Sequence, residues 1–184
     1  MSTDAITLLK DDHRAVKHLF DQFKATEDRK AKAILAKEAL LELKIHTTVE
    51  EEIFYPAVRR AMQKALGKDE TTDVMDEADE EHHVAKLLIA ELETMKPSDS
   101  HWEAKFHVLS EGVLHHVKEE EGDMFPKARK LDLDFDAMGA QMLARKDELK
   151  KGGIPAFAEQ GLIAKFGIAD SPADASAKRP APRH

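Results

Sequence analysis

Apolar residues recur at intervals of three and four along most of the chain, which is the spacing of one face of an α-helix. Short polar or turn-forming stretches interrupt this pattern near residues 26–28, 68–72 and 97–100. The pattern predicts helices over about residues 4–25, 28–66, 73–95 and 100–126. Ser100 with Glu103 fits a capping box at the start of the last of these helices. Pro56 removes one backbone donor and predicts a kink in the second helix.

Short connections between consecutive helices predict that neighbours run antiparallel. The expected fold class is therefore all-α, an up-down-up-down four-helix bundle over residues 1–130. A further helix is predicted over about 133–150 and a short one over 154–168, so that residues 131–169 form a helical extension packing on the bundle. From residue 170 to 184 the chain is rich in Ser, Pro, Ala and basic residues, which cannot bury a core. We expect a disordered tail there.

One segment of the chain occurs twice. HTTVEEEIFYP at residues 46–56 returns as HVKEEEGDMFP at residues 116–126, with a His ten residues before a Pro and a Glu four residues after the His. Each copy has a second His upstream, His13 and His82, at separations of 33 and 34 residues. The repeat therefore covers a pair of helices, and we interpret it as an internal duplication within one domain.

The repeated residues predict a metal site inside the bundle. Four residues of α-helix turn about 400°, so a His and the Glu four residues later point the same way. Their distances from the helix connections place both repeats at one height in an antiparallel bundle. The candidate metal ligands are His13, His46, Glu50, His82, His116 and Glu120. Buried carboxylates need a counter-charge, and no Lys or Arg on these faces lies at that height, so cations are the expected partners.

The ligand types narrow the choice of metal. The chain contains no Cys, which excludes thiolate ligands, disulfides and cysteine nucleophiles. Imidazole with carboxylate suits iron, manganese or zinc, and three protein ligands per ion leave coordination positions open. Two such sites would lie close enough for Glu50 and Glu120 to bridge them. Iron uses sites of this kind to bind or activate dioxygen, peroxide or nitric oxide, although zinc could occupy the same ligands.

Composition bears on location and partners. A formal net charge of −8 over 184 residues argues against binding to nucleic acid. No window approaches the roughly eighteen apolar residues of a membrane span, and the N-terminal residues do not have the pattern of a signal peptide. We therefore expect a cytoplasmic protein that binds neither nucleic acid nor membrane, with a monomer favoured.

The repeated HxxxE motifs, each followed by an acidic residue and a Pro, resemble the haemerythrin-like HHE cation-binding domain family over about residues 4–130. The resemblance implies a four-helix bundle that carries a non-haem di-iron centre with an oxo or hydroxo bridge. One iron would be held by His13, His46 and Glu50, and the other by His82, His116 and Glu120. In that family the two Glu residues bridge the pair.

The chain departs from the oxygen-carrying haemerythrins at two positions. Those proteins have a second His four residues after the helix-three His, where this chain has Lys86. They also have an Asp five residues after the helix-four His, where this chain has Glu121. A site with fewer His ligands leaves more room for solvent or peroxide, which favours sensing or turnover over reversible carriage of oxygen.

Other polar residues near the motifs have weaker claims. His83 and His115 point about 100° away from the neighbouring candidate ligands, which indicates surface or supporting roles. We expect solvent exposure for His18, His101 and His107, and for Glu51, Glu52, Glu119 and Glu121. Tyr55 aligns with Phe125 of the second repeat, which argues for a packing role, although a phenol near di-iron could supply a proton.

Three functions fit these features. The first is a di-iron protein that binds or reacts with oxygen, nitric oxide or another small oxidant. The second is an enzyme that decomposes hydrogen peroxide at the same centre in a catalase-like reaction. The third is a module that stores or buffers iron or zinc.

Overall fold

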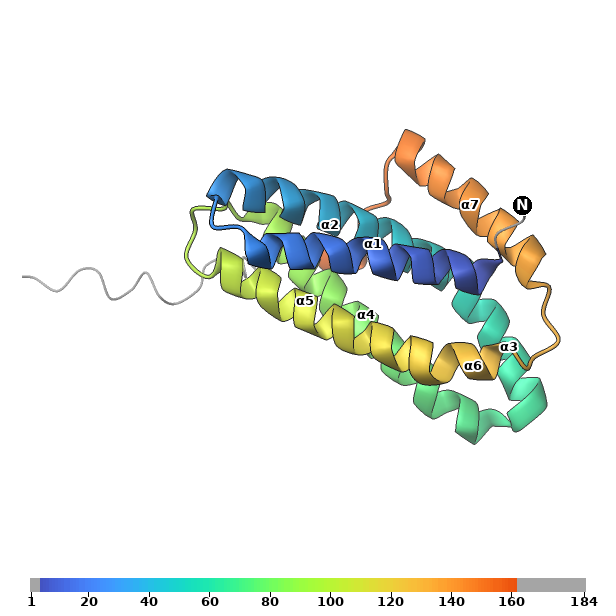
Figure 1. The fold of residues 1–184 in the computed structure, drawn as a ribbon. Coiled ribbons are helices and arrows are strands. Elements are labelled where there is room, and N and C mark those ends of the chain that lie inside the picture. The colour runs from blue at the N-terminus through green and yellow to red at the C-terminus, as the bar shows by residue number, and fades with distance from the viewer. Residues whose placement is uncertain (1–3, 162–184) are drawn as a thin grey trace, which may run out of the picture.

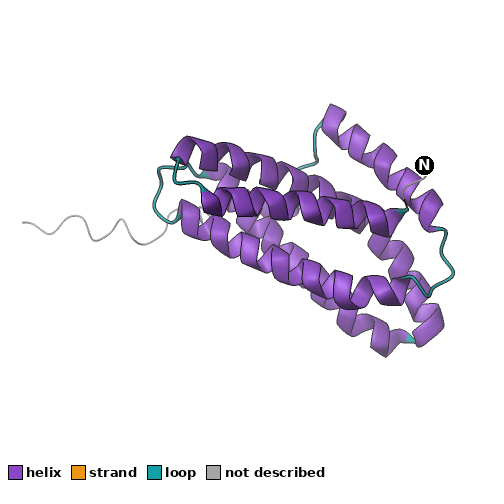
Figure 2. Ribbon diagram, viewed as in Figure 1, coloured by secondary structure: helices purple, strands orange, loops and turns teal. Residues whose placement is uncertain are grey.

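The computed structural model describes residues 4–161, apart from the side chains at positions 66 and 68–73. These residues are almost entirely helical and include no strand (Figure 2). In chain order the elements are α1 (Ala5–Ala25), α2 (Arg29–Val49), the π-helix η1 (Glu50–Phe54), α3 (Tyr55–Leu66), α4 (Lys68–Thr94), α5 (Trp102–Glu119), the π-helix η2 (Glu120–Met124), α6 (Phe125–Ala128) and α7 (Phe135–Gly152). The predicted all-α class is confirmed.

Aspartate side chains cap the first turns of several helices. Asp4 precedes α1 and accepts a hydrogen bond from the Thr7 backbone N–H at 3.1 Å. Asp28 precedes α2 and accepts from the Lys30 N–H. Asp134 does the same for α7. Each carboxylate satisfies a backbone donor that has no partner within the helix and lies near the positive end of the helix dipole.

The helices pack as two hairpins and one additional helix (Figure 1). Helix α1 packs against α2, and α4 packs against α5. Helix α7 lies against α1 and α2, so that it covers the first hairpin. Apolar residues form two clusters, one around Phe54, Val58 and Phe125 and the other around Phe20, Phe106 and Leu109. The residues of the HxxxE motifs lie between these clusters along the hairpins.

Both repeats contain a widened helical turn just before their Pro. The Tyr55 N–H bonds to the Glu50 carbonyl, and the Phe125 N–H bonds to the Glu120 carbonyl, each five residues back. The ring of a Pro clashes with the carbonyl four residues before it, and Pro has no N–H to donate, so an extra residue per turn relieves the conflict. The kink expected at Pro56 thus takes the form of the π-helix η1.

This widened turn changes which residues are buried after Glu50. The three-and-four spacing of Leu43, His46 and Glu50 predicts that the buried face of a regular helix continues through Ile53 and Ala57. In the structure these two are only half-buried, whereas Phe54, Tyr55 and Val58 lie in the core. That part of the predicted face is wrong because the π-helix shifts it by one residue.

Two predicted helix starts are also wrong. Helix α4 begins at Lys68, directly after Gly67, and not near residue 73. Gly67 turns the chain by itself with a φ of 94°, a conformation open mainly to Gly. Helix α5 begins at Trp102 after His101, which has a φ of 67° and makes no side-chain cap. The predicted capping box does not form, because Glu103 instead pairs with Lys32 of α2 at 2.7 Å.

The C-terminal part of the chain is described in part. Residues 158–161 are helical. The remainder of the helix expected over 154–168, and the whole tail expected over 170–184, lie outside the described residues. Within residues 4–161, no helix combines the length and the apolar character needed to cross a membrane.

Gly112 in the middle of α5 provides a test of this fold. A Cβ added at Gly112 meets open space, and its φ is not positive, so Gly112→Ala should raise the free energy of unfolding by about 0.5–1 kcal/mol. The reason is the lower conformational entropy of the unfolded chain. Urea denaturation measures the change. Gly153→Ala is the matched control, because Gly153 has a φ of 86° and the same substitution should be destabilising. A loss of stability in Gly112→Ala would contradict this description of α5.

Candidate metal centre

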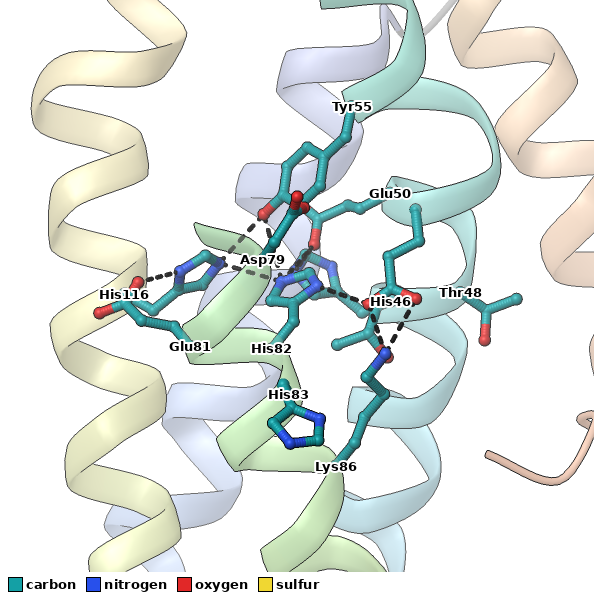
Figure 3. A network of polar contacts seen from close by, with 12 residues as sticks. His46, Thr48, Glu50, Tyr55, Asp79, Glu81, His82, His83, Lys86 and His116 are labelled. Atoms are coloured by element: carbon teal, nitrogen blue, oxygen red, sulfur yellow. Dashed lines mark hydrogen bonds and ion pairs between the residues drawn. The ribbon is translucent and has the colours of Figure 1, made fainter. Parts of the chain in front are cut away.

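The structure brings the six sequence-predicted ligands into one buried cluster, hereafter the His/Glu cluster. Its members are His13 on α1, His46 on α2, Glu50 on η1, His82 on α4, His116 on α5 and Glu120 on η2. None is more than 6% exposed, and Glu50 is fully buried. Three side chains of the first hairpin therefore meet three of the second in the interior between the hairpins, as Figure 3 shows for His46, Glu50, His82 and His116.

In every imidazole of the cluster, Nε2 faces a carboxylate oxygen. Glu50 Oε2 lies 3.1 Å from Nε2 of His46 and 3.4 Å from Nε2 of His82. Glu120 Oε2 lies 3.2 Å from Nε2 of His13 and 3.4 Å from Nε2 of His116. One oxygen of each Glu is thus placed between imidazoles of both hairpins.

The other ring nitrogen, Nδ1, is held by a second carboxylate in every case. We call Asp12, Glu51, Glu81 and Glu121 the outer carboxylates. The Nδ1 distances are 2.9 Å for His13 with Glu121, 3.3 Å for His46 with Asp12, 3.1 Å for His82 with Glu51 and 2.7 Å for His116 with Glu81. An ionised carboxylate can only accept, so Nδ1 carries a proton; once a ring has lost its second proton, its Nε2 lone pair points into the cluster.

The outer carboxylates follow the internal repeat. Asp12 and Glu81 each precede the first His of a hairpin and hold the second His of the same hairpin. Glu51 and Glu121 each follow the cluster Glu and hold a His of the other hairpin. The contacts of Glu51 and Glu121 tie the two hairpins together around the cluster.

Cationic side chains support the outer carboxylates from outside. Lys86 Nζ lies 2.9 Å from Glu51, and Lys146 of α7 pairs with Asp12. Lys10 lies 3.8 Å from Glu121. Among the described residues, no Lys or Arg ion pair reaches Glu50 or Glu120. In this part of the chain, Lys side chains therefore pair with outer carboxylates and not with the two buried Glu residues of the cluster.

Tyr55 enters the cluster from the start of α3. Its hydroxyl donates to Glu120 Oε1 at 2.9 Å and lies 3.2 Å from Nε2 of both His82 and His116 (Figure 3). Burial and the charges of Glu120 and Glu50 raise the pKa of Tyr55 well above its ordinary value, so the phenol keeps its proton. The matching position of the second repeat, Phe125, stacks on His13 with ring centroids 5.8 Å apart. The two halves of the site are therefore chemically different.

The cluster passes a test of fit to metal ions. Ligand atoms about 2.1 Å from one ion stand about 3.0–3.4 Å apart at octahedral or tetrahedral angles. The Nε2-to-carboxylate distances of the cluster, 3.1–3.4 Å, lie in or close to this range. Both oxygens of Glu50, Oε2 of Glu120 and Nε2 of His13 are buried and have no hydrogen-bond partner among the described residues. Unsatisfied buried acceptors that converge at this spacing fit a metal site.

Protons are the other means of neutralising these carboxylates. Burial disfavours the charged form of His46, but the charge of Glu50 and the hydrogen bond of Asp12 outweigh it and raise the pKa of His46 to about 10. Burial likewise opposes protonation of His82, and contacts with Glu50 and Glu51 raise its pKa to about 9. Burial raises the pKa of Glu50, but the charge of His46 holds it well below its ordinary value. A cation must therefore displace protons from these rings.

The structure groups the ligand atoms in a way that the sequence did not predict in full. His13, His46, Glu50 and Glu120 place one ligand atom each within 4.8 Å of one another. Glu50, His82 and His116 do the same on the other side. Glu50 is common to both groups, whereas Glu120 lies closer to the ligands of the first hairpin.

The sequence interpretation missed four supporting carboxylates. Glu51 and Glu121 are expected to face solvent, yet both are about one-third exposed and bind imidazoles. Asp12 and Glu81 are assigned no role. For Tyr55 the sequence favours packing, with a phenol able to supply a proton as the alternative, and the structure places its hydroxyl on Glu120. A signal was present for the carboxylates, because an acidic residue stands next to the His or the Glu at the same offset in both repeats.

The other His residues within residues 4–161 lie outside the cluster. His83 is half-exposed and contacts Glu159 at 2.8 Å. His115 is exposed and lies 3.2 Å from Glu119. His107 contacts Glu111, His101 precedes α5, and His18 is exposed. Glu52 is exposed and pairs with Arg145 of α7 at 2.6 Å.

The chain is similar in sequence to known proteins. Over 158 residues the chain is 26% identical to the uncharacterized protein Rv2633c of Mycobacterium tuberculosis, a match that covers 84% of this chain and 91% of that protein. It is also 26% identical over 122 residues to a DNA nickase of Nostoc sp., covering 66% of this chain. The match spans only 32% of the nickase, about a third of its length.

The fold has a counterpart among crystal structures. The chain resembles the Hemerythrin HHE cation binding domain-containing protein of Mycobacterium kansasii, a homolog of Rv2633c, with a TM-score of 0.64 and 24% sequence identity. This likeness covers 81% of this chain and 88% of the other. The family model of the Hemerythrin HHE cation binding domain matches residues 4–128. The chain therefore belongs to the haemerythrin HHE cation-binding domain family.

Proposed function

We propose that the His/Glu cluster binds two iron ions and reacts with a small oxidant or gas, such as oxygen, peroxide or nitric oxide. One ion would be held by His13 and His46 and the other by His82 and His116, with Glu50 and Glu120 shared between them. The position of Glu50 Oε2 carries this proposal, because it lies within 3.4 Å of Nε2 atoms from both hairpins and has no hydrogen-bond partner among the described residues. Under this proposal the two hairpins together form the up-down-up-down four-helix bundle that the sequence predicts.

The donor set fits iron, and the proposed reaction with an oxidant favours iron over zinc, which has no redox chemistry. Imidazole and carboxylate without thiolate also suit zinc and manganese, which are the less favoured alternatives. Two irons would supply the electrons that a small oxidant accepts. One group of ligand atoms comes from four residues and the other from three. Each iron would therefore keep coordination positions open for such a molecule.

The protein's own groups would orient the ligands and hold a proton. The outer carboxylates fix each imidazole by its Nδ1, so that Nε2 keeps one direction. The hydroxyl oxygen of Tyr55 lies 2.9 Å from Glu120 Oε1, and both groups are buried. The phenol keeps its proton there. A phenol in this position can donate a hydrogen bond to whatever occupies the cluster.

Two alternatives follow from the same site. A catalase-like enzyme that decomposes hydrogen peroxide is favoured by the protonated phenol of Tyr55 beside the ligands. A module that stores or buffers iron or zinc would need the ligands but not the phenol. We extend the proposal to a cytoplasmic monomer that binds neither membrane nor nucleic acid. The activity of the Nostoc nickase is not carried over, because the match spans a third of that protein and the net charge here is −8.

Metal binding should be visible in stoichiometry and stability. Protein purified after growth with iron should contain two irons per chain, measured by elemental analysis. Each cation should add about 2.7 kcal/mol of stability at a free concentration one hundred times its Kd. The melting temperature should therefore fall when a chelator removes the metal. One metal per chain, or equal melting temperatures with and without metal, would contradict the proposal.

The outer carboxylates should matter for affinity. Glu51→Ala removes the partner of His82 Nδ1, and loss of such a partner typically weakens metal binding by about 10–100-fold. Titration of the metal-free protein with cobalt(II) measures the affinity, and circular dichroism checks that the helices remain. Glu52→Ala is the matched control, since Glu52 contacts Arg145 at the surface. Equal cobalt affinities for the two variants would show that Glu51 does not support the site.

Reaction with peroxide separates the functional alternatives. Hydrogen peroxide should change the near-ultraviolet absorption of the iron-loaded protein, and Glu120→Ala should abolish the change by removing a shared ligand. An oxygen electrode run in parallel identifies catalase-like turnover if two molecules of hydrogen peroxide yield one of oxygen. If the absorption spectrum of the iron-loaded protein does not change on adding peroxide, oxygen or nitric oxide, the result would favour the storage function.

A further inference from the structure

A cavity of about 420 Å³ lies between α1, α2, α4 and α5 and ends on all four imidazoles of the His/Glu cluster. Its wall is mostly apolar and includes Val16, Leu43, Leu88, Leu109 and Val113. Pockets for small organic molecules have volumes of roughly 300–1,000 Å³, and their linings are mainly apolar. The volume is thus in the range for an organic molecule and exceeds what a diatomic gas needs.

The cavity lies on the side of the cluster away from Phe54, Tyr55 and Phe125, and a second, smaller pocket reaches His116 and Glu120. Phe54, Tyr55 and Phe125 belong to the core cluster on the other side, where Phe125 stacks on His13 and Tyr55 packs on His82. Val16, Leu43 and Leu109 belong to the second core cluster. Aromatic packing therefore closes one face of the His/Glu cluster, while the apolar cavity opens onto the other.

The floor of the cavity offers little hydrogen bonding. Each imidazole has its Nδ1 bound to an outer carboxylate, and its Nε2 faces Glu50 or Glu120. The ring nitrogens are therefore engaged, and they leave little hydrogen bonding for a molecule in the cavity. An apolar cavity of this kind holds water poorly and binds apolar molecules instead.

Exposed apolar side chains and acidic side chains line the opening of the cavity. Val84 of α4 and Val108 of α5 line it and are 54% and 55% exposed. Glu77, Glu80 and Glu81 of α4 also line it, against Lys17 of α1. This excess of negative charge disfavours anionic molecules such as fatty-acid carboxylates.

We propose that this cavity binds an uncharged, mainly apolar organic molecule, with one end against the four imidazoles. The binding site stands independently of any metal. Its role as the place where an apolar reactant meets the metal centre rests on the proposed function. In that role the cavity would admit uncharged reactants with a large apolar part and disfavour charged ones.

The test uses the full-length, iron-loaded protein and a pair of fluorescent probes. N-phenyl-1-naphthylamine, which is uncharged, should bind at one saturable site with a rise in fluorescence. 8-Anilinonaphthalene-1-sulfonate has the same ring system with an added negative charge, and should bind about tenfold more weakly or worse. Val113→Phe, which fills the cavity one turn before His116, should weaken binding of the uncharged probe by about tenfold or more. Ile34→Phe on the exposed face of α2 is the matched control and should leave binding unchanged.

Iron content, measured in every sample, separates this inference from the proposed function. Protein that binds the probe saturably but retains no iron after loading would refute the proposed function and leave the cavity site standing. Iron-loaded protein without saturable binding, or equal affinities in the wild type and Val113→Phe, would overturn the inference. Equal binding of the two probes would overturn the selection for uncharged molecules. If Val113→Phe does not fold, Gly112→Leu serves instead, because a Cβ at Gly112 meets open space at the cavity wall.

Discussion

Two carboxylates that water does not reach face four imidazole nitrogens, and the rest of the structure is built around this contact. Glu50 and Glu120 each present an oxygen 3.1–3.4 Å from two Nε2 atoms. A carboxylate oxygen and a neutral Nε2 are both acceptors, so they repel each other unless a proton or a cation lies between them. Buried negative charge without compensation would cost several kcal/mol. Positive charge at this place is therefore a condition for the folded state.

The surrounding elements fix the contact from outside. Each imidazole is held on Nδ1 by an outer carboxylate, and two of these carboxylates come from the opposite hairpin. Helix α7 brings Lys146 to Asp12, which in turn holds His46. The π-helices widen the turn after each cluster Glu and place Tyr55 and Phe125 against the imidazoles. The same turns that accommodate Pro56 and Pro126 thus also shape the site.

The sequence was sufficient to predict the helical class and to choose six side chains that meet in the interior. It succeeded because a His and a Glu four residues apart share a helix face, and because the motif occurs twice at matching heights. It failed for Glu51 and Glu121, because each binds a His of the other hairpin and a single-helix pattern carries no such information. It left Tyr55 open between packing and a role beside the metal ligands, because a regular helix does not include the extra residue of η1. The start of α4 was misplaced because Gly67 alone reverses the chain.

The haemerythrin HHE family gives this chain a fold and a cation-binding character, and the two sides of the cluster differ in ways that concern function. One side carries a phenol with a firmly held proton, and the other opens into an apolar cavity. Diffraction from crystals of the iron-loaded protein, recorded at the iron absorption edge, tests the central claim most directly. We expect two anomalous peaks within the His/Glu cluster, one beside His13 and His46 and the other beside His82 and His116. An ordered cluster with no peak, or iron bound only elsewhere, would contradict it.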